Sequence, residues 1–404
     1  MSTVHVPRRV AIVAGLVLTA LVAARPSAQA PEYDVVIRQG RVLDGMGNPW
    51  ILADVAISDG HVVRVGRVTG AGRREIDATG RYVSPGWIDM MDQSGGALPV
   101  NGLAENKLRM GVTTAIGGEG GTPVPAEGIA EYFATLARQG ISINFGTYYS
   151  EAQARTAVLG NTARAPNADE LTRIQDLMAT AMKAGAMGMT TALIYPPSSF
   201  ASTEELIAVA TVAGQYGGIY ASHMRDEGRE LLTAVDEAIT IGERGGLPVE
   251  IFHLKAAFQP GWGTLMAKAG AAIDAARARG VDVAADLYVY TAGGTGLEAT
   301  IPTWAQEGGR AALIQRLADP AIRARLAREI ETGLPGWSNM VEAAGGWTGI
   351  VLSNAQNPEN AKYEGQTIAA IAKTRGVEPA EAAFDLVAQG RGRVMAIFHM
   401  MSEP

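Results

Sequence analysis

The sequence predicts an α/β protein whose main domain is a parallel (β/α) barrel. Two observations support this prediction. Short apolar segments alternate with helical stretches over residues 85–404, which is the pattern of repeated βαβ units. Seven such repeats can be recognised, and this repeat number is typical of an eight-stranded barrel of the TIM type.

Residues 1–30 have the order of a secretory signal peptide. Arg8 and Arg9 precede an apolar run at residues 10–24, and the small-residue stretch 27–30 follows. The run is short for a membrane span. We therefore expect a cleaved signal, a periplasmic or secreted location, and no stable membrane span after cleavage. The alternatives are a retained anchor and the absence of any export signal.

Residues 31–84 predict a small β unit before the barrel. Its segments of alternating polarity are 33–37, 54–57 and 61–66. Turns at Gly40 and at Asp59-Gly60 separate them, so we expect a small antiparallel unit, the N-terminal portion of a β-sandwich.

The barrel strands follow in order along residues 85–404. We expect them at 86–91, 112–117, 141–149, 188–195, 218–224, 248–255 and 281–290. Helices rich in Ala, Leu and Glu lie between them, for example at 204–216, 230–244 and 265–279.

An eighth strand would follow the helices expected at 368–375 and 379–389. The remaining segment, 392–404, has room for a strand or a helix and for no loop after it. We therefore expect a barrel that is incomplete at its C-terminus. Its first and seventh strands would have unpaired edges, which favours poor solubility or self-association.

Two histidines occupy equivalent places in neighbouring strands. His223 ends the fifth strand and His253 ends the sixth. The carboxyl ends of barrel strands face one rim, so both imidazoles can reach a single metal ion. The alternative is two unrelated polar residues at strand ends. Because the chain has only 5 histidines, we favour the metal site.

Cationic and aromatic side chains share the faces of these histidines. Residues two apart in a strand point the same way, so Lys255 accompanies His253 and Arg225 accompanies His223. Both cations can hold a substrate carboxylate; the alternative for each is an ion pair with Asp226, Glu227 or Glu250. Tyr288 belongs to a shared face at the end of the seventh strand, with Asp286 and Tyr290.

Composition excludes several kinds of site. The chain has no cysteine, so a metal must be held by nitrogen or oxygen ligands. Its net charge is -7 and it has no basic stripe or tail, so we expect no nucleic-acid partner.

Over nearly all of its length after residue 30, the sequence resembles the N-acyl-D-amino-acid deacylase (D-aminoacylase) family of the amidohydrolase superfamily. The motifs that carry the resemblance are 83–89, 111–114, 185–189, 193–197, 220–227, 253–255, 286–290 and 301–304. The resemblance implies a metallo-dependent hydrolase barrel with a small β-sandwich built from both chain ends. It also implies zinc-dependent hydrolysis of N-acyl-D-amino acids to a D-amino acid and a carboxylic acid.

The resemblance also suggests residue roles. His223 and His253 match the two metal-binding histidines of the family. Lys255 and a tyrosine near Tyr288 match residues that contact the substrate carboxylate, and Arg225 is a further candidate for this contact.

The sequence departs from the family pattern at the first two strands. Met91 and Gln93 stand where the family has a His-x-His pair, so we expect one zinc ion and not two. Gly120 occupies the place of the family's cysteine ligand. Its neighbour Glu119 can supply an oxygen ligand instead; the alternative is a loop or helix-start carboxylate.

The family's catalytic aspartate follows the eighth strand in a Ser-Asp-Gly-like motif. Nothing after Glu403 can supply it, so we assign no catalytic residue within the sequence. The sequence therefore predicts a hydrolase of acylated amino acids whose activity in a chain of this length is open. The alternatives are an impaired, ligand-binding barrel, another amidohydrolase activity on dipeptides or cyclic amides, and a non-enzymatic exported structural protein.

Overall fold

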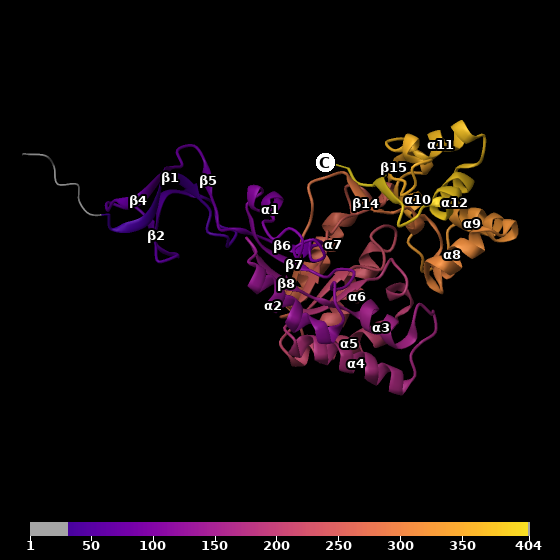
Figure 1. The fold of residues 1–404 in the computed structure, drawn as a ribbon, viewed down its shortest axis with the longest axis horizontal. Helices are drawn as coiled ribbons and strands as arrows, with labels where there is room; N and C mark the ends of the chain where they lie inside the picture. The colour runs from indigo at the N-terminus through magenta and orange to yellow at the C-terminus, as the bar shows by residue number, and fades with distance from the viewer. Residues whose placement is uncertain (1–30, 403–404) are drawn as a thin grey trace, which may run out of the picture. The chain divides into compact units, whose positions relative to one another are not determined.

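The computed structural model describes residues 31–402. The expected signal peptide lies outside the described residues. Contacts divide the chain into two units, with the boundary along the chain between Gly86 and Trp87 (Figure 1). Among the described helices, none combines the length and the apolar character that crossing a membrane requires.

The first unit is a five-stranded sheet. Its strands are β1 (Tyr33–Val42), β2 (Ile51–Ser58), β3 (His61–Gly66), β4 (Gly72–Asp77) and β5 (Tyr82–Val83). The order is β3-β2-β1-β4, and β5 also pairs with β1. The β1–β2 and β2–β3 pairs are antiparallel, but β4 and β5 run parallel to β1. The three segments expected to pair antiparallel, 33–37, 54–57 and 61–66, do so as parts of β1, β2 and β3. The parallel strands β4 and β5 are additions that the sequence analysis did not predict.

The second unit begins with the predicted barrel strands. They are β6 (Trp87–Asp92), β7 (Val112–Gly117), β8 (Asn144–Thr147), β9 (Tyr149–Ser150), β10 (Gly188–Ala192), β11 (Ile219–His223), β12 (Val249–Ile251) and β13 (Val283–Ala285). They form two parallel sheets, β6-β7-β8 and β9-β10-β11-β12-β13. All seven predicted segments contain strand, and β8 and β9 together occupy the third.

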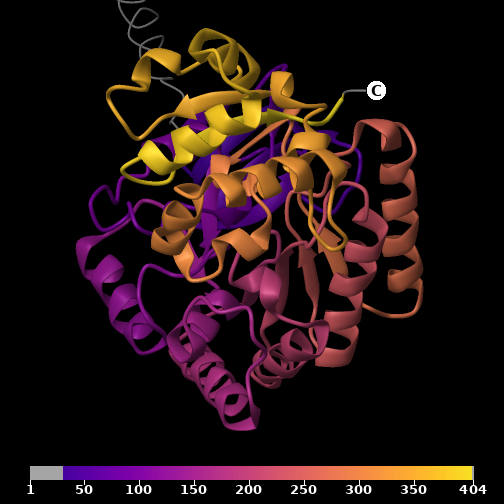
Figure 2. The ribbon, with the colours of Figure 1, turned by 90° about the vertical axis from the view of Figure 1, so that its right-hand side faces the viewer.

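Helices cover the outside of these strands, as Figure 2 shows. They are α1 (Glu105–Arg109), α2 (Ile129–Gln139), α3 (Glu151–Leu159), α4 (Ala168–Lys183), α5 (Thr203–Gln215), α6 (Leu231–Gly245) and α7 (Leu265–Ala278). Every residue of β10 is buried, since the barrel interior lies on one side of it and helices lie on the other. The main apolar core joins this strand to α4, α5 and α6.

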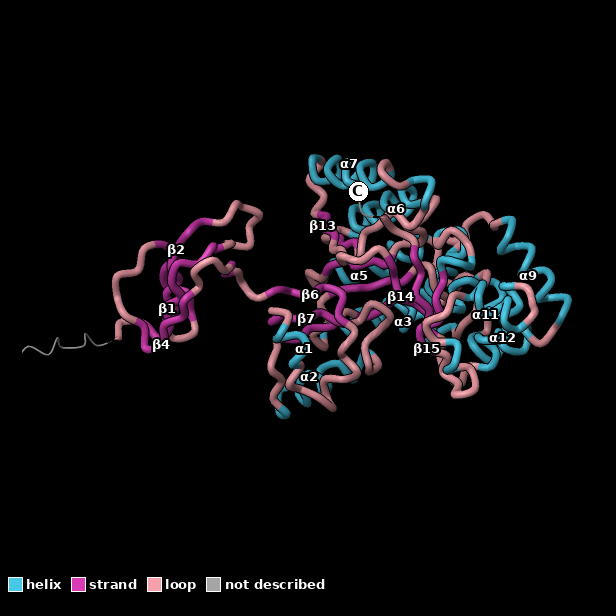
Figure 3. Tube along the Cα trace, turned by 90° about the horizontal axis from the view of Figure 1, so that it is seen from above, coloured by secondary structure: helices cyan, strands magenta, loops and turns pink. Residues whose placement is uncertain are grey.

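The rest of the second unit packs around its own core. A three-stranded antiparallel sheet contains β14 (Ala292–Gly296), β15 (Ile350–Asn354) and β16 (Met395–His399) (Figure 3). The helices beside it are α8 (Gly309–Leu317), α9 (Pro320–Thr332), α10 (Met340–Ala343), α11 (Ile368–Arg375) and α12 (Pro379–Gln389). Leu352, Phe384 and Phe398 lie at the centre of this core.

The last strand of the chain lies outside the barrel. The segment 392–404, for which a strand or a helix was expected, contains β16, and β16 lies between β14 and β15. Its burial alternates, with Ala396 and Phe398 buried and Ile397 and His399 more exposed. Such a strand suits a sheet with one covered face, whereas a barrel strand is buried on both faces. Within residues 31–402, β6 pairs only with β7, and β13 only with β12.

A buried charge cluster ties α3 to α5 within the second unit. The side chain of Arg155 is fully buried and forms an ion pair with Glu205, which is also buried. Glu151 lies one turn before Arg155, is fully buried, and accepts a hydrogen bond from Ser198 at 3.3 Å. Burial, together with the Glu205 carboxyl, raises the pKa of Glu151 well above its usual 4.5.

This raised pKa predicts how stability depends on pH. The folded chain keeps a proton on Glu151 that the unfolded chain releases above pH 4.5. The stability contributed by this group is therefore complete below pH 4.5 and declines as the pH rises through the raised value. We expect Glu151→Gln to flatten the fall in unfolding free energy above pH 4.5, measured by urea unfolding across a pH series. Glu204→Gln, at an exposed carboxyl with a lowered pKa, should leave that slope unchanged; equal slopes for Glu151→Gln and the unsubstituted chain would contradict the prediction.

Candidate metal centre

Three residues that can bind a metal meet at the carboxyl-terminal ends of the barrel strands. His223 is the last residue of β11, and His253 lies just beyond β12. Glu119 lies in the loop that follows β7. The parallel direction of the strands places all three on one rim.

Local backbone conformations bring Glu119 and His253 to this rim. Gly118 has a φ of 104°, and a Cβ there would lie 2.7 Å from the carbonyl oxygen of Tyr148, so the turn before Glu119 requires glycine. His253 has a φ of 37°, in the left-handed region. Its backbone N–H donates to Oδ1 of Asp286 at 2.5 Å, which stabilises this uncommon conformation.

The three side chains are close enough to share one ion. Oε1 of Glu119 lies 2.9 Å from Nδ1 of His223 and 3.5 Å from Nε2 of His253. The two imidazole rings have centroids 4.5 Å apart and planes at 85°. One potential ligand atom from each of the three residues lies within 4.8 Å of the other two.

The protonation of the three groups reflects burial and mutual contact. Burial alone would raise the pKa of Glu119, but hydrogen bonds from His223 and His253 reverse this and hold its pKa well below the usual range. Burial lowers the pKa of His223. Burial also acts to lower the pKa of His253, but the charge of Glu227 outweighs it and raises that pKa to about 9.

These residues fit a divalent metal ion. Two imidazoles and one carboxylate form a nitrogen and oxygen donor set of the kind that holds catalytic zinc. The Nε2 atom of His223 is buried and has no hydrogen-bond partner among the described residues, and Oε2 of Glu227 is 3.9 Å from it. A buried polar atom without a hydrogen-bond partner raises the free energy of the folded state. A ligand at this nitrogen would remove that destabilisation.

Glu227 belongs to the site and was not assigned a role there from the sequence. It is buried, and its Oε1 lies 2.9 Å from Nδ1 of His253 and 2.5 Å from Nζ of Lys255. A carboxylate on the second nitrogen of a metal-binding imidazole orients the ring and its tautomer. The available signal was its place in the motif 220–227, four residues after His223.

Two of the three predicted substrate contacts border the same site. Nζ of Lys255 lies 2.9 Å from Nδ1 of His253 and 5.6 Å from the ring centroid of Tyr288. The rings of Tyr288 and His253 have centroids 6.3 Å apart. Lys255 and Tyr288 are thus adjacent to each other and to one candidate ligand.

Arg225 has other partners. Its guanidinium pairs with Glu237, with Nε 2.9 Å from Oε2, and it donates to the backbone carbonyls of Ser199 and Ala201. The chain leaves the strand direction at His223, so the alternation that placed Arg225 beside it does not continue. The structure therefore favours the ion-pair alternative, with a carboxylate that the sequence did not suggest, and we place no substrate contact on Arg225.

The residues at the first strand also have defined surroundings. Met91 packs with an apolar cluster that includes Ile116, Tyr148 and Phe252. Gln93 donates from Nε2 to Oε2 of Glu119 at 2.9 Å.

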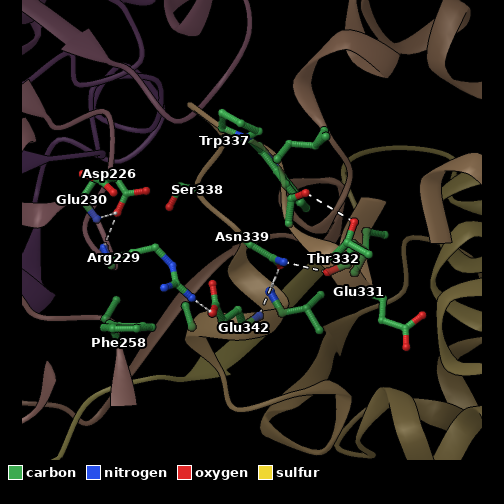
Figure 4. Close-up of a pocket in the computed structure, with 18 of the residues that line it drawn as sticks. Asp226, Arg229, Glu230, Phe258, Glu331, Thr332, Trp337, Ser338, Asn339 and Glu342 are labelled. Atoms are coloured by element: carbon green, nitrogen blue, oxygen red, sulfur yellow. Dashed lines mark hydrogen bonds and ion pairs between the residues drawn. The ribbon is translucent and has the colours of Figure 1, made fainter. Parts of the chain in front are cut away.

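A cavity of about 1340 Å³ is lined by Arg225, by the loop after β11 and by residues from the segment 327–347. Figure 4 shows Arg229 directed toward Glu342, with which it forms an ion pair. Phe258 lies beneath the Arg229 guanidinium, at 5.0 Å from ring centroid to Cζ. The lining of this cavity does not include Glu119, His223 or His253, so the candidate ligands lie outside it.

Comparison with known proteins gives independent evidence on the fold and the family. No family model matches the chain. The chain is 34% identical over 285 residues to the N-acyl-D-glutamate deacylase of Alcaligenes xylosoxydans xylosoxydans, an alignment that covers 65% of this chain. The aligned part spans 58% of that relative's length.

Two solved structures are similar over most of this chain. One is the N-acyl-D-glutamate deacylase from Bordetella bronchiseptica in complex with zinc and a phosphonate inhibitor that mimics the tetrahedral intermediate (TM-score 0.71, 26% identity, covering 92% of this chain and 72% of that one). The other is a D-aminoacylase with a binuclear metal centre, activated by one metal and attenuated by a second (TM-score 0.71, 27% identity, the same coverage). This likeness confirms the predicted barrel fold.

Proposed function

Because this chain belongs to the N-acyl-D-amino-acid deacylase family of the amidohydrolase superfamily, we propose that it is a metal-dependent hydrolase of N-acyl-D-amino acids or similar acylated amino acids. The observation that carries the proposal is the convergence of Glu119, His223 and His253 on one rim of the barrel. The substrate class comes from the relatives, which are an N-acyl-D-glutamate deacylase and a D-aminoacylase. The proposed binding partner of this chain is therefore a small molecule.

We assign the metal as one zinc ion held by Glu119, His223 and His253. Zinc accompanies the related deacylase, and the donor set here consists of nitrogen and oxygen atoms only. When bound, such an ion supplies Lewis acidity to the acyl carbonyl and to water. Met91 and Gln93 supply no imidazole near this position, which is why we assign a single ion.

The protein's own groups orient that centre. Glu227 holds Nδ1 of His253 at 2.9 Å, so the Nε2 atom of that ring faces Glu119. Nδ1 of His223 faces Oε1 of Glu119 at 2.9 Å, and the buried Nε2 atom of the same ring has no hydrogen-bond partner among residues 31–402. Both rings are almost completely buried, so few competing waters reach them in the absence of substrate.

We assign Lys255 and Tyr288 as the contacts to the substrate carboxylate. Nζ of Lys255 also forms the ion pair with Glu227 that was its alternative, at 2.5 Å from Oε1. The ammonium group of Lys255 lies 5.6 Å from the ring centroid of Tyr288 and next to the candidate ligand His253. A charged hydrogen bond to a carboxylate contributes about 1.5–3 kcal/mol, which corresponds to roughly tenfold to hundredfold in affinity.

We therefore expect Lys255→Met to raise KM for an N-acyl-amino acid by roughly tenfold or more. The KM for the matching N-acyl-amino acid amide, which has no carboxylate, should change much less. Steady-state kinetics on both substrates, with the zinc content of each protein measured in parallel, test this. An equal rise for both substrates at unchanged zinc content would contradict the assigned contact.

A substrate panel tests the proposed function itself. The zinc-loaded chain is incubated with N-acetyl-D- and N-acetyl-L-amino acids, a dipeptide and a cyclic amide, and the free amine is measured with and without a chelator. We expect release from the D-substrates that the chelator abolishes. Binding of N-acyl-D-amino acids without release would support an impaired, ligand-binding barrel, and release only from the dipeptide or cyclic amide would support another amidohydrolase activity.

For location, we propose the periplasm or secretion. The support is the basic, apolar and small-residue order of residues 1–30. Fractionation of a bacterium that expresses the chain, followed by N-terminal sequencing, should give a product cleaved near residue 30. An intact N-terminus in the cytosolic fraction would contradict this proposal.

A further inference from the structure

Gln93 makes a specific contact with the candidate metal centre. It directly follows β6, and its Nε2 atom lies 2.9 Å from Oε2 of Glu119. The partner is a carboxylate, which only accepts hydrogen bonds when it is ionised. The amide must therefore direct an N–H, and not its carbonyl, toward Glu119.

This contact gives the two oxygens of Glu119 different environments. Oε1 faces the imidazoles, at 2.9 Å from Nδ1 of His223 and 3.5 Å from Nε2 of His253. Oε2 receives the amide of Gln93. The carboxylate is therefore held so that one oxygen points into the site and the other away from it.

We propose that Gln93 is a positioning residue of the metal centre. Its amide holds Glu119 in the orientation in which Oε1 can bind the ion. The hydrogen bond from this amide to Oε2 also prevents a second cation from binding that oxygen. This inference rests on the proposed function, because it requires that Glu119, His223 and His253 bind zinc.

The chemistry beside Oε2 explains why a second cation is excluded. An amide N–H carries partial positive charge, which repels a cation, and it occupies one of the lone pairs of Oε2. Met91, the other side chain at this end of β6, packs in an apolar cluster. Across residues 31–402 no second group of three histidine or acidic ligands is present.

Two substitutions of Gln93 separate the two parts of the proposal. Gln93→Leu removes the donor, and we expect the affinity for the first zinc ion to fall by about tenfold or more, as is common when a group that orients a ligand is lost. Gln93→Glu replaces the donor with an acceptor, and we expect zinc content in excess metal to rise from one to two ions per chain.

The measurements use the full chain with zinc alone as the probe. Competition with a chromophoric chelator gives the affinity, and elemental analysis after gel filtration gives the stoichiometry. Absorption of the cobalt-substituted protein reports the coordination geometry, which a merely structural role for Gln93 would not change. Asn48→Leu is the matched control, because Asn48 donates an amide to Asp44 at 2.7 Å in the first unit.

The outcomes distinguish this inference from the proposed function. Absence of bound zinc in the unsubstituted chain would overturn both. Normal zinc binding in the unsubstituted chain, with the same affinity and cobalt spectrum in Gln93→Leu, would overturn the positioning role alone. A single ion in Gln93→Glu would overturn the exclusion of a second cation, and circular dichroism of each metal-free variant checks that its fold is unchanged.

Discussion

His253→Ala is expected to lower the zinc affinity of the chain by more than about 100-fold, since loss of a group that merely orients a ligand costs about 10–100-fold. The substitution removes one of three ligands. It also removes the ring that lies between Glu227 and Glu119. Chelator competition measures the affinity, and the amine-release assay should fall to background in parallel.

His61→Ala is the matched control for this prediction. His61 is exposed at the start of β3, in the first unit. Its replacement should leave zinc affinity and turnover unchanged. Retention of stoichiometric zinc by His253→Ala, with an affinity within tenfold of the unsubstituted chain, would show that His253 is not a ligand.

Arg155→Met is expected to destabilise the second unit by about 3–5 kcal/mol, the usual cost of removing one partner of a buried ion pair. The side chain of Arg155 is fully buried, and it contacts Glu205 and the backbone carbonyl of Arg164. Methionine keeps most of the volume but leaves the Glu205 carboxylate in an apolar setting without its cation. Urea unfolding at neutral pH measures the loss.

Arg244→Met gives the matched comparison. Arg244 pairs with Glu204, the neighbour of Glu205, but both of these side chains are exposed. An exposed pair contributes about 0–1 kcal/mol, so this variant should unfold close to the unsubstituted chain. Arg155→Met combined with Glu205→Gln should recover part of the lost stability. Equal effects of Arg155→Met and Arg244→Met would contradict the assigned role of the buried pair.

Most of the barrel could be predicted from local pattern. β7 was predicted with its observed bounds, and β10 and β11 lie within their predicted segments. Such strands are buried on both sides, so they appear in the sequence as short apolar runs between amphipathic helices. The places of His223 and His253 followed from the same pattern, because each stands where an apolar run ends.

The strand at 395–399 could not be placed in this way. A strand pattern gives no information about its partners, and β16 pairs with segments about 45 and 100 residues earlier in the chain. Arg225 gives a second case, since its partner Glu237 lies on the next helix and the loop between them decides the contact.

The sequence by itself determined the order of strands and helices, the two candidate ligands at strand ends, and the donor chemistry left to a chain without cysteine. These depend on periodicity and residue type, which are properties of short segments. Only the tertiary structure decided that Gln93 and Glu227 approach the ligands, that Arg225 is paired with Glu237, and that β16 joins β14 and β15. Those contacts depend on where loops and strand ends come together in space, and residues distant in the chain meet there without any local pattern that specifies them.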